Sequence, residues 1–426
     1  MKKKGIVLFP IETISRELDY KLRLGILLKK AGYRVVLARE DLIDKIAKKN
    51  KGGIYVGKNI FKTLFPASLA TYKKYKKNYW KILYLDEEGG IYRGDENDWE
   101  EVLLSRIKPE VLSKDDKILV WGEAQKEILL KHNPKAEIIV TGCPRFDYSH
   151  EKIIRSGKKY HILINMSYSL FNNHDGIKYS IDEKKFRNSP VAIKNLKFKD
   201  QWLKQGSEFM QMQELVHSLA EDKSLKIAIR PHPAEDNELY ELLYSDLSNV
   251  DVVNNKSAKY YILKSNVLIH NGCTTAIEAY FLGTPVIGFH GKTDGIKIPL
   301  SIGTNFSSFN EIIKFLSTPK NIDNQGPIDS MPSRWVNNFK DPDVLNKIVG
   351  IIQTYKLKEA SLNYMGTLLY DAVKIFCYKI LFSFIPNRGF ALHQKKFPGF
   401  CTDDIVHKLK QNNIDYIFVG ENMIIL

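Results

Sequence analysis

Two polar stretches combine residue types that can carry out a group transfer, and each directly follows an apolar run. The first is "DEEGG", in which Asp86, Glu87 and Glu88 precede a pair of glycines that can turn the chain. A partly desolvated carboxylate has a raised pKa and can accept a proton from a sugar hydroxyl. We therefore expect one of these acids to be catalytic, although acids in this position can also simply solvate a loop.

The second stretch is "RPHPAED", which contains Arg230, His232 and Pro233. Proline fixes its own φ and restricts the residue before it, so the two prolines that flank the histidine hold its imidazole in one place. Arginine and histidine both offer hydrogen-bond donors, and arginine can bind two oxygens at once. The stretch predicts a phosphate site with a catalytic histidine, while a turn that only ends a strand stays open as an alternative.

A third stretch, "LIHNGCTTAIEAYF", is typical of a strand that leads through a tight turn into a helix. Asn271 and Gly272 turn the chain, and Thr274 or Thr275 can cap the helix that follows. Free N–H groups at a helix N-terminus attract anions, so we expect donor binding here. Glu278 lies one turn into the helix and could reach a ribose hydroxyl; an ordinary capped helix would have the same pattern.

Two further charged positions lie where the first half of the chain meets the second. Glu123 in "WGEAQ" opens a predicted helix, and Arg145 in "TGCPRFD" lies near the expected junction. These side chains could contribute to the site, or they could form ion pairs that only stabilise a hinge.

Apolar runs that alternate with helical segments must position all of these side chains. Residues 1–150 contain the runs "GIVLFP", "RVVLAR", "GGIYVG", "KILYL", "KILVW" and "AEIIV", and residues 151–340 contain "HILIN", "LKIAIR", "VDVV", "NVLIH" and "PVIGF". This alternation predicts an α/β fold with two Rossmann-like domains that face each other across a cleft. Residues 341–426 predict a helical C-terminal tail. Parallel sheets place ligands at the carboxyl ends of their strands, where most of the polar stretches lie.

The composition narrows the partners and excludes several classes of enzyme. Lys and Arg outnumber Asp and Glu by 64 to 49, a net charge of +15, which favours an anionic partner. The four cysteines have no zinc-binding spacing and fit a reducing cytoplasm. The sequence has no phosphate-loop, dinucleotide, HExxH or GxSxG motif, which argues against a P-loop ATPase, a dehydrogenase, a zinc protease and a serine hydrolase.

With these motifs in order, the chain resembles the bacterial surface carbohydrate (capsule and lipopolysaccharide) biosynthesis proteins. The resemblance rests on "PIETISRELDYKLRL", "LDEEG", "WGEAQ", "TGCPRFD", "RPHPAED" and "LIHNGCTTAIEAYFLGTPVI", and it spans about residues 5–300. These proteins are similar to GT-B glycosyltransferases that use CMP-activated ulosonic acids such as Kdo and sialic acid. In those enzymes an acidic D/E-D/E-G motif and an HP motif face each other across the cleft.

The resemblance implies a role for each motif. Asp86 or Glu87 would act as base or stabiliser, His232 would contact the donor phosphate, and the "NGCTT" turn would hold phosphate or nucleotide. It implies a CMP-linked nucleotide-sugar donor as substrate, with no metal and no other cofactor. The extra acid in "DEEGG" departs from the family pattern and leaves the catalytic carboxylate undecided. Asp200 is a candidate nucleophile only by its position before the HP motif.

Two other functions remain open at this stage. A teichoic-acid type of enzyme would transfer glycerol phosphate or ribitol phosphate from a CDP-linked donor on a similar fold. A nucleic-acid-binding protein is favoured by the charge alone, and the basic residues are spread out with no known nucleic-acid motif, so we expect no nucleic-acid partner.

The expected acceptor is a glycan or a lipid-linked glycan, which places the protein in the cytoplasm, on the inner face of the membrane. "YKKYKKNYWK", residues 72–81, interleaves lysines with aromatic residues, a combination that suits an anionic membrane surface as well as a solvated helix. An aromatic helix at about 361–384 could add an apolar anchor.

Overall fold

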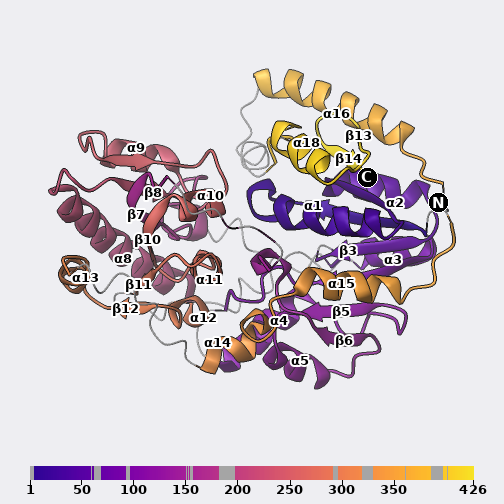
Figure 1. The fold of residues 1–426 in the computed structure, drawn as a ribbon, viewed down its shortest axis with the longest axis horizontal. Coiled ribbons are helices and arrows are strands. Elements are labelled where there is room, and N and C mark those ends of the chain that lie inside the picture. Colours follow the sequence, from indigo (N-terminus) through magenta and orange to yellow (C-terminus); the bar gives the residue numbers. More distant parts are fainter. Residues whose placement is uncertain are drawn as a thin grey trace.

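The computed structural model contains two α/β domains, each built around its own sheet (Figure 1). It describes residues 4–58, 60–61, 69–92, 96–149, 151, 153, 157–181, 197–290, 296–318, 330–359, 361–384, 397–400 and 402–426. Figure 1 shows the second domain on the left, and the first domain with the C-terminal segment on the right.

The first sheet has eight strands in the order β13-β14-β2-β1-β3-β4-β5-β6. Its six N-terminal strands are mutually parallel: β1 (Ile6–Ile11), β2 (Arg34–Arg39), β3 (Gly53–Gly57), β4 (Trp80–Leu85), β5 (Lys117–Val120) and β6 (Glu137–Val140). The helices of this domain are α1 (Ile14–Lys30), α2 (Glu40–Lys49), α3 (Ala70–Lys77), α4 (Glu96–Arg106), α5 (Glu123–Leu130) and the short η1 (Pro144–Phe146). The central strands are buried on both faces, which explains their continuous apolar runs.

The second sheet has six parallel strands in the order β12-β11-β10-β7-β8-β9. They are β7 (Tyr160–Asn165), β8 (Ile227–Arg230), β9 (Val250–Val252), β10 (Ser265–His270), β11 (Val286–Phe289) and β12 (Thr304–Phe306). The helices are η2 (Tyr179–Ile181), α8 (Lys197–Ala220), α9 (Asn237–Leu243), α10 (Ala258–Leu263), α11 (Thr275–Phe281), α12 (Lys297–Leu300) and α13 (Phe309–Leu316). The predicted α/β class with two Rossmann-like domains is confirmed.

The C-terminal segment corrects part of the sequence-based expectation. It contains helices, α14 (Ser330–Trp335), η4 (Asn337–Phe339), α15 (Val344–Gln353), α16 (Met365–Phe384) and α18 (Thr402–Gln411), but also two strands, β13 (Ile417–Phe418) and β14 (Met423–Ile425). β14 pairs antiparallel with β2 and covers an edge of the first sheet that would otherwise expose its backbone groups. An apolar run of only a few residues gave too weak a pattern to predict this strand.

The chain also returns to the first domain earlier than residue 340, where we expected the second domain to end. Arg334 of α14 forms an ion pair of 2.6 Å with Glu127 of α5, and the backbone N–H of Asn337 donates to the carbonyl of Trp121. Trp335 lies directly against Gly122, where an added Cβ would stand 2.4 Å from its carbonyl carbon. The residues from α14 onward therefore complete the first domain.

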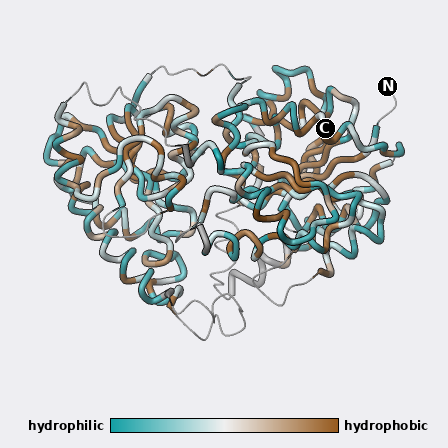
Figure 2. The backbone as a smooth tube through the Cα atoms, turned by 90° about the horizontal axis from the view of Figure 1, so that it is seen from below, coloured by the Kyte–Doolittle hydropathy of each residue, from teal (hydrophilic) through white to brown (hydrophobic). Residues whose placement is uncertain are grey.

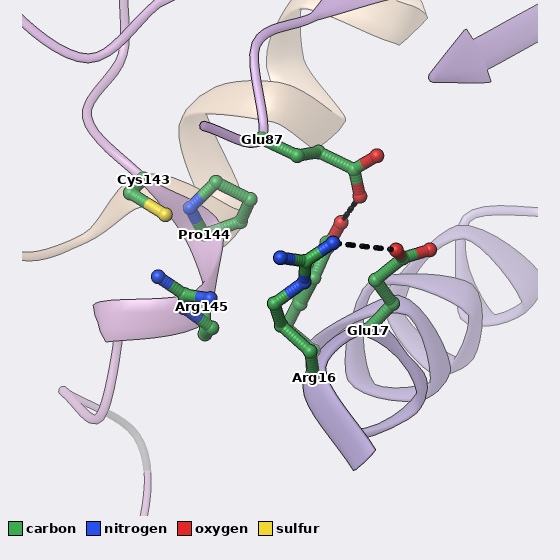
Figure 3. A pocket seen from close by; sticks show the side chains of 7 residues that line it. Arg16, Glu17, Glu87, Cys143, Pro144 and Arg145 are labelled. Carbon is green, nitrogen blue, oxygen red and sulfur yellow. Dashed lines mark hydrogen bonds and ion pairs between the residues drawn. The ribbon is translucent and has the colours of Figure 1, made fainter. Parts of the chain in front are cut away.

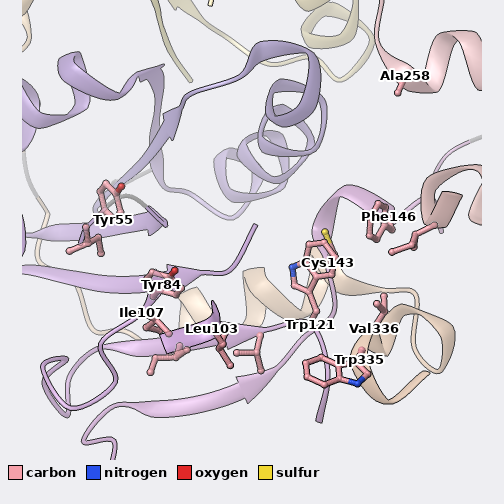
Figure 4. Packing of buried hydrophobic residues seen from close by; sticks show 14 of the residues in the cluster. Tyr55, Tyr84, Leu103, Ile107, Trp121, Cys143, Phe146, Ala258, Trp335 and Val336 are labelled. Atoms are coloured by element: carbon pink, nitrogen blue, oxygen red, sulfur yellow. The ribbon is translucent and has the colours of Figure 1, made fainter. Parts of the chain in front are cut away.

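The apolar core continues across the boundary between the domains. Figure 2 shows hydrophobic residues concentrated in the strands of the first sheet, and Figure 4 shows Trp121, Phe146, Trp335 and Val336 gathered near the junction. Phe146 of η1 also stacks on Phe281 of α11, with ring centroids 6.4 Å apart. Within the described ranges, none of the helices is long and apolar enough to cross a membrane.

Candidate active site

The last residues of three neighbouring strands in the second sheet are polar, and their side chains form a row. In the strand register, Asn165 at the end of β7 pairs with His270 of β10 on one side and with Arg230 of β8 on the other. Each of the three has one buried polar atom with no hydrogen-bond partner among the described residues: Asn165 Oδ1, His270 Nε2 and Arg230 Nε. Buried polar atoms are almost always paired in folded proteins. These three atoms are therefore candidates for hydrogen bonds to a bound polar group.

His270 is a neutral hydrogen-bond donor fixed by the turn that follows it. Its Nδ1 accepts from the backbone N–H groups of Gly272 (3.0 Å) and Cys273 (3.3 Å), so Nε2 carries the proton. The side chain is fully buried, and this burial lowers the pKa of His270 to about 3. Gly272 is needed here because its φ is +86°, in the left-handed region. Sequence reasoning gave His270 no role, although its place between a buried strand and a glycine turn was a usable signal.

The two threonines of the turn bond to Arg145 and Asn165, and Thr274 makes no side-chain capping bond. Thr274 precedes α11 without a side-chain capping bond, which corrects the predicted cap. Its Oγ1 instead accepts from the Arg145 guanidinium at 3.1 Å, and Thr275 Oγ1 accepts from Asn165 Nδ2 at 2.7 Å. Asn271 donates to the Ser167 carbonyl at 3.4 Å and leaves its Oδ1 buried without a partner in the described part of the chain.

Arg230 is the cation of this row. Burial lowers its pKa, and the groups that partly oppose this effect are Cys273, Glu278 and Tyr261. Glu278 is itself buried and accepts a hydrogen bond of 3.0 Å from the Tyr148 hydroxyl. This contact joins α11 to the end of the first domain, and the suggested ribose contact of Glu278 stays a prediction.

His232 lies in a loop that a buried carboxylate holds in shape. The Glu235 carboxylate is fully buried and accepts from the His232 backbone N–H at 3.2 Å and from the Tyr240 hydroxyl at 2.9 Å. His232 Nδ1 accepts from the Ala234 N–H at 3.2 Å, so the neutral ring carries its proton on Nε2. The loop is therefore fixed by Glu235 as well as by Pro231 and Pro233, as the two prolines suggested.

The first domain contributes a network of buried, paired charges at the end of β4. The Glu87 carboxylate accepts a hydrogen bond from the Tyr20 hydroxyl, and its Oε1 lies 2.7 Å from Lys21 Nζ. Lys21 is fully buried and also contacts Glu17 at 2.9 Å and the Pro10 carbonyl at 2.7 Å. Glu87 is thus held in place by partners on α1, and its predicted catalytic role stays a prediction.

The other two acids of "DEEGG" differ from each other in their surroundings. Burial alone would raise the pKa of Glu88, but Lys58 at 2.9 Å and Arg16 at 3.6 Å bring it below its usual range. Burial raises the pKa of Asp86, whose Oδ1 accepts from the Glu88 N–H at 3.0 Å. Asp86 Oδ2 is buried and has no partner among the described residues. Asp86 is the acid of this stretch best suited to accept a proton.

A small pocket lies beside the acidic stretch of the first domain. It has an empty volume of about 230 Å³, including its open mouth, and it is lined by Arg16, Glu17, Tyr20, Glu87, Cys143, Pro144 and Arg145. Figure 3 shows Arg16, Glu17 and Glu87 on one side, with Cys143, Pro144 and Arg145 across from them. Because Arg145 also donates to Thr274, one side chain touches both the acidic pocket and the turn before α11.

Two predicted residues lie apart from this arrangement. Glu123 is exposed on the first turn of α5, and Asp200 is exposed on the first turn of α8. Within the described part of the chain, neither contacts another predicted site residue. Their positions in the sequence, after a strand and before the HP motif, carried no information about the direction of the side chain.

Comparisons with known proteins found similar folds but no related sequence. No protein-family model and no curated protein matches the chain. Similar solved structures include the UDP-GlcNAc 2-epimerase of Methanocaldococcus jannaschii, with 14% identity, a TM-score of 0.48, and coverage of 82% of this chain and 99% of that chain. A putative UDP-N-acetylglucosamine 2-epimerase from Listeria monocytogenes has 14% identity, a TM-score of 0.49, and coverage of 83% and 96%. The wall teichoic acid polymerase TagF, in a variant form, has 14% identity, a TM-score of 0.45, and coverage of 83% and 88%. Identities and TM-scores this low assign no activity to this chain.

Proposed function

We propose that the chain is a glycosyltransferase of bacterial surface polysaccharide biosynthesis that uses a CMP-activated ulosonic acid such as Kdo or a sialic-acid-like sugar. The observation that carries this proposal is the row of Asn165, His270 and Arg230, whose buried polar atoms lack partners at the carboxyl ends of three parallel strands. Ligands of parallel sheets bind at these ends. Two of the three unpartnered atoms are N–H donors, which suits the oxygens of a phosphate.

The transfer step uses the two parts of the site in different ways. The bond between the anomeric carbon and the phosphate oxygen breaks, and CMP leaves with the bonding electrons. The acceptor hydroxyl forms the new bond to the anomeric carbon, and its proton passes to Asp86, whose pKa burial raises. Arg230, His270 and His232 stabilise the charge that develops on the leaving phosphate. No step of this scheme needs a metal ion.

The charge around the site supports this division of roles. Arg230 forms no ion pair among the described residues, so an anionic ligand would supply the missing counter-charge at that end of the row. In the first domain Lys21 already has Glu17 and Glu87 as partners, and Lys58 has Glu88. We therefore place the nucleotide phosphate at the second sheet and the acceptor hydroxyl near Asp86.

The donor class can be tested by nucleotide release. The protein is incubated with a cell-derived glycan acceptor and, in separate reactions, with CMP-Kdo, CMP-sialic acid, CDP-glycerol or UDP-GlcNAc, and the freed nucleotide is quantified. We expect CMP to be released from a CMP-ulosonic acid. Release from CDP-glycerol alone would favour the phosphotransferase alternative, and conversion of UDP-GlcNAc to its epimer without acceptor would contradict glycosyl transfer.

A further inference from the structure

The helix α16 presents an apolar stripe to solvent. Met365 and Leu369 are each 68% exposed and Val373 is 52% exposed, and these residues recur every four positions along one side of the helix. The opposite side is buried: Thr367 is fully covered, and Asp371 accepts from Arg39 at 2.8 Å. A stripe of this kind marks a binding surface on a folded protein, because exposed apolar residues normally occur singly.

Two helices with exposed lysines, α2 and α3, lie beside this stripe. α16 packs on α2, where Lys45 Nζ lies 4.1 Å from the centre of the Tyr370 ring and Lys374 pairs with Asp41 at 2.6 Å. α2 in turn contacts α3 through a bond of 2.8 Å between the Tyr75 hydroxyl and Asp44. Figure 1 shows α2 and α3 on the side of the first domain away from the second domain.

Five exposed lysines of these two helices have no acidic partner in the described part of the chain. These residues, Lys48, Lys49, Lys73, Lys74 and Lys77, form no ion pair with any described residue. Lys48 and Lys74 line the same groove between α2 and α3, together with Asp44, Ala47, Thr71, Tyr75 and Asn78. The nearby acids Asp41 and Asp44 are already engaged by Arg39, Lys374 and Tyr75. The surface is therefore positively charged beside an apolar stripe.

The structure also corrects the expectation for residues 72–81. Tyr72, Tyr75 and Trp80 are buried in the core and cannot contact a membrane, which leaves Tyr79 as the exposed aromatic residue of this stretch. Lys76 is paired with Asp116 at 2.7 Å and Lys81 with Asp115 at 2.8 Å, so these two lysines are not available either. Sequence alternation alone could not separate the inward side chains from the outward ones.

We propose that the stripe of α16 and the free lysines of α2 and α3 form a docking surface for a membrane that contains anionic phospholipids. The lysines attract the lipid phosphates, and the apolar side chains of α16 enter the headgroup region. A second copy of this surface would be repelled by its own charge. A nucleic acid would leave the apolar stripe uncovered.

Vesicle sedimentation tests the proposal directly. The full chain is mixed with neutral phosphatidylcholine vesicles and with vesicles that contain a quarter phosphatidylglycerol, at low and high salt. We expect binding to the anionic vesicles at low salt and release at high salt. The K48Q/K74Q/K77Q variant should bind at least about tenfold more weakly. The matched K135Q/K256Q/K314Q variant, with three exposed lysines removed elsewhere, should bind like the wild type.

A second variant tests the apolar part. L369S/V373S should lower binding to anionic vesicles about tenfold or more, and its thermal melting should match the wild type because both side chains are exposed. Equal binding to neutral and anionic vesicles would overturn the proposal, as would equal losses in the K48Q/K74Q/K77Q and control variants. Complete competition by millimolar inorganic phosphate would show a free-phosphate site, and stronger binding to duplex DNA would show a nucleic-acid surface. Either result would contradict a lipid-docking role.

Discussion

The two sheets end in polar groups of opposite character. At the end of β4, Glu87 and Lys21 are buried and contact each other, and each has further partners. At the ends of β7, β8 and β10, Asn165, Arg230 and His270 are adjacent in register and each leaves a buried atom without a partner. The Glu87–Lys21 pair therefore has its partners within the protein, whereas the row of the second sheet leaves three buried polar atoms unpaired in the described part of the chain.

This difference suggests separate roles: the paired charges of the first domain stabilise the fold, and the unpartnered groups of the second sheet bind a ligand. A buried charge network with complete pairing is costly to break, because the remaining partner stays buried and uncompensated. An unpartnered buried group lowers the stability of the free protein and gains most when a ligand arrives. We therefore expect substitutions in the Glu87–Lys21 network and in the row of the second sheet to change stability in opposite directions. The predictions below test that contrast.

The largest effect on stability should come from Lys21→Met in the first domain. The substitution leaves Glu17 and Glu87 buried without their shared cation, which should lower the free energy of unfolding by about 3–5 kcal/mol. Urea denaturation at pH 7 measures this change. Lys81→Met removes an exposed pair with Asp115 and should cost less than about 1 kcal/mol. A loss below 1 kcal/mol for Lys21→Met would show that the network is not structural.

The largest effect on turnover should come from His232→Ala. Loss of a donor to the developing phosphate charge typically lowers the rate about 10²- to 10³-fold. The half-buried ring lies in a loop that Glu235 holds through the backbone, so the melting temperature should change little. Nucleotide release under saturating donor measures the rate, with His407→Ala on α18 as the control. A fully active His232→Ala enzyme would remove this residue from the site.

Arg230→Met should have the opposite effect on stability to Lys21→Met. The guanidinium is partly buried without an ion-pair partner among the described residues, and burial lowers its pKa. Its replacement by an apolar side chain of similar length should raise the free energy of unfolding of the ligand-free protein by about 1 kcal/mol or more. Urea denaturation without nucleotide measures this. A destabilisation as large as that of Lys21→Met would show that Arg230 has a structural role.

A further effect on stability, seen only below neutral pH, should come from His270. Its folded pKa of about 3 lies below the ordinary value of 6.5, so between these values the unfolded chain binds a proton that the folded chain does not. Stability should therefore fall as the pH drops from 6.5 towards 3, by up to about 1.4 kcal/mol per pH unit from this group.

Substitution of His270 isolates this contribution. His270→Asn keeps an acceptor for the Gly272 N–H and removes the titration, so its stability should decline less steeply than that of the wild type. His161→Asn, at an exposed position in the same sheet, serves as the control and should keep the wild-type slope. Identical pH profiles for wild type and His270→Asn between pH 6.5 and 4 would contradict a neutral buried imidazole.

The pattern of apolar residues was sufficient to predict the two-domain fold, but it did not predict the structure of the C-terminal segment. The central strands are buried on both faces and therefore read as continuous apolar runs, which is why the two-domain α/β architecture could be predicted. Strand β14 is short, and its pairing with β2 depends on contacts between residues almost 400 positions apart. The crossing of α14 back to the first domain likewise depends on Trp335 packing beside Gly122, which no local pattern shows.

The site was predictable at the level of motifs but not of individual atoms. The motifs placed Asp86 and Arg230 at the ends of strands and Thr274 at the start of a helix, where the structure has them. Which acid has an unpartnered oxygen depends on Lys21 and Lys58, which come from distant segments. Composition also could not show that three of the four aromatic residues at 72–81 point into the core.

A calorimetric titration with nucleotide tests the central claim most directly. CMP, CDP and UDP are titrated into the wild type, into Arg230→Met, and into Arg334→Met, where an exposed arginine paired with Glu127 is removed. We predict that at least one nucleotide, CMP before the others, binds the wild type and that Arg230→Met lowers its affinity about 10- to 100-fold, as expected for loss of a charged hydrogen bond. Arg334→Met should leave the affinity unchanged. If no nucleotide binds the wild type, or if Arg230→Met binds it equally well, the unpartnered edge of the second sheet is not a nucleotide-phosphate site.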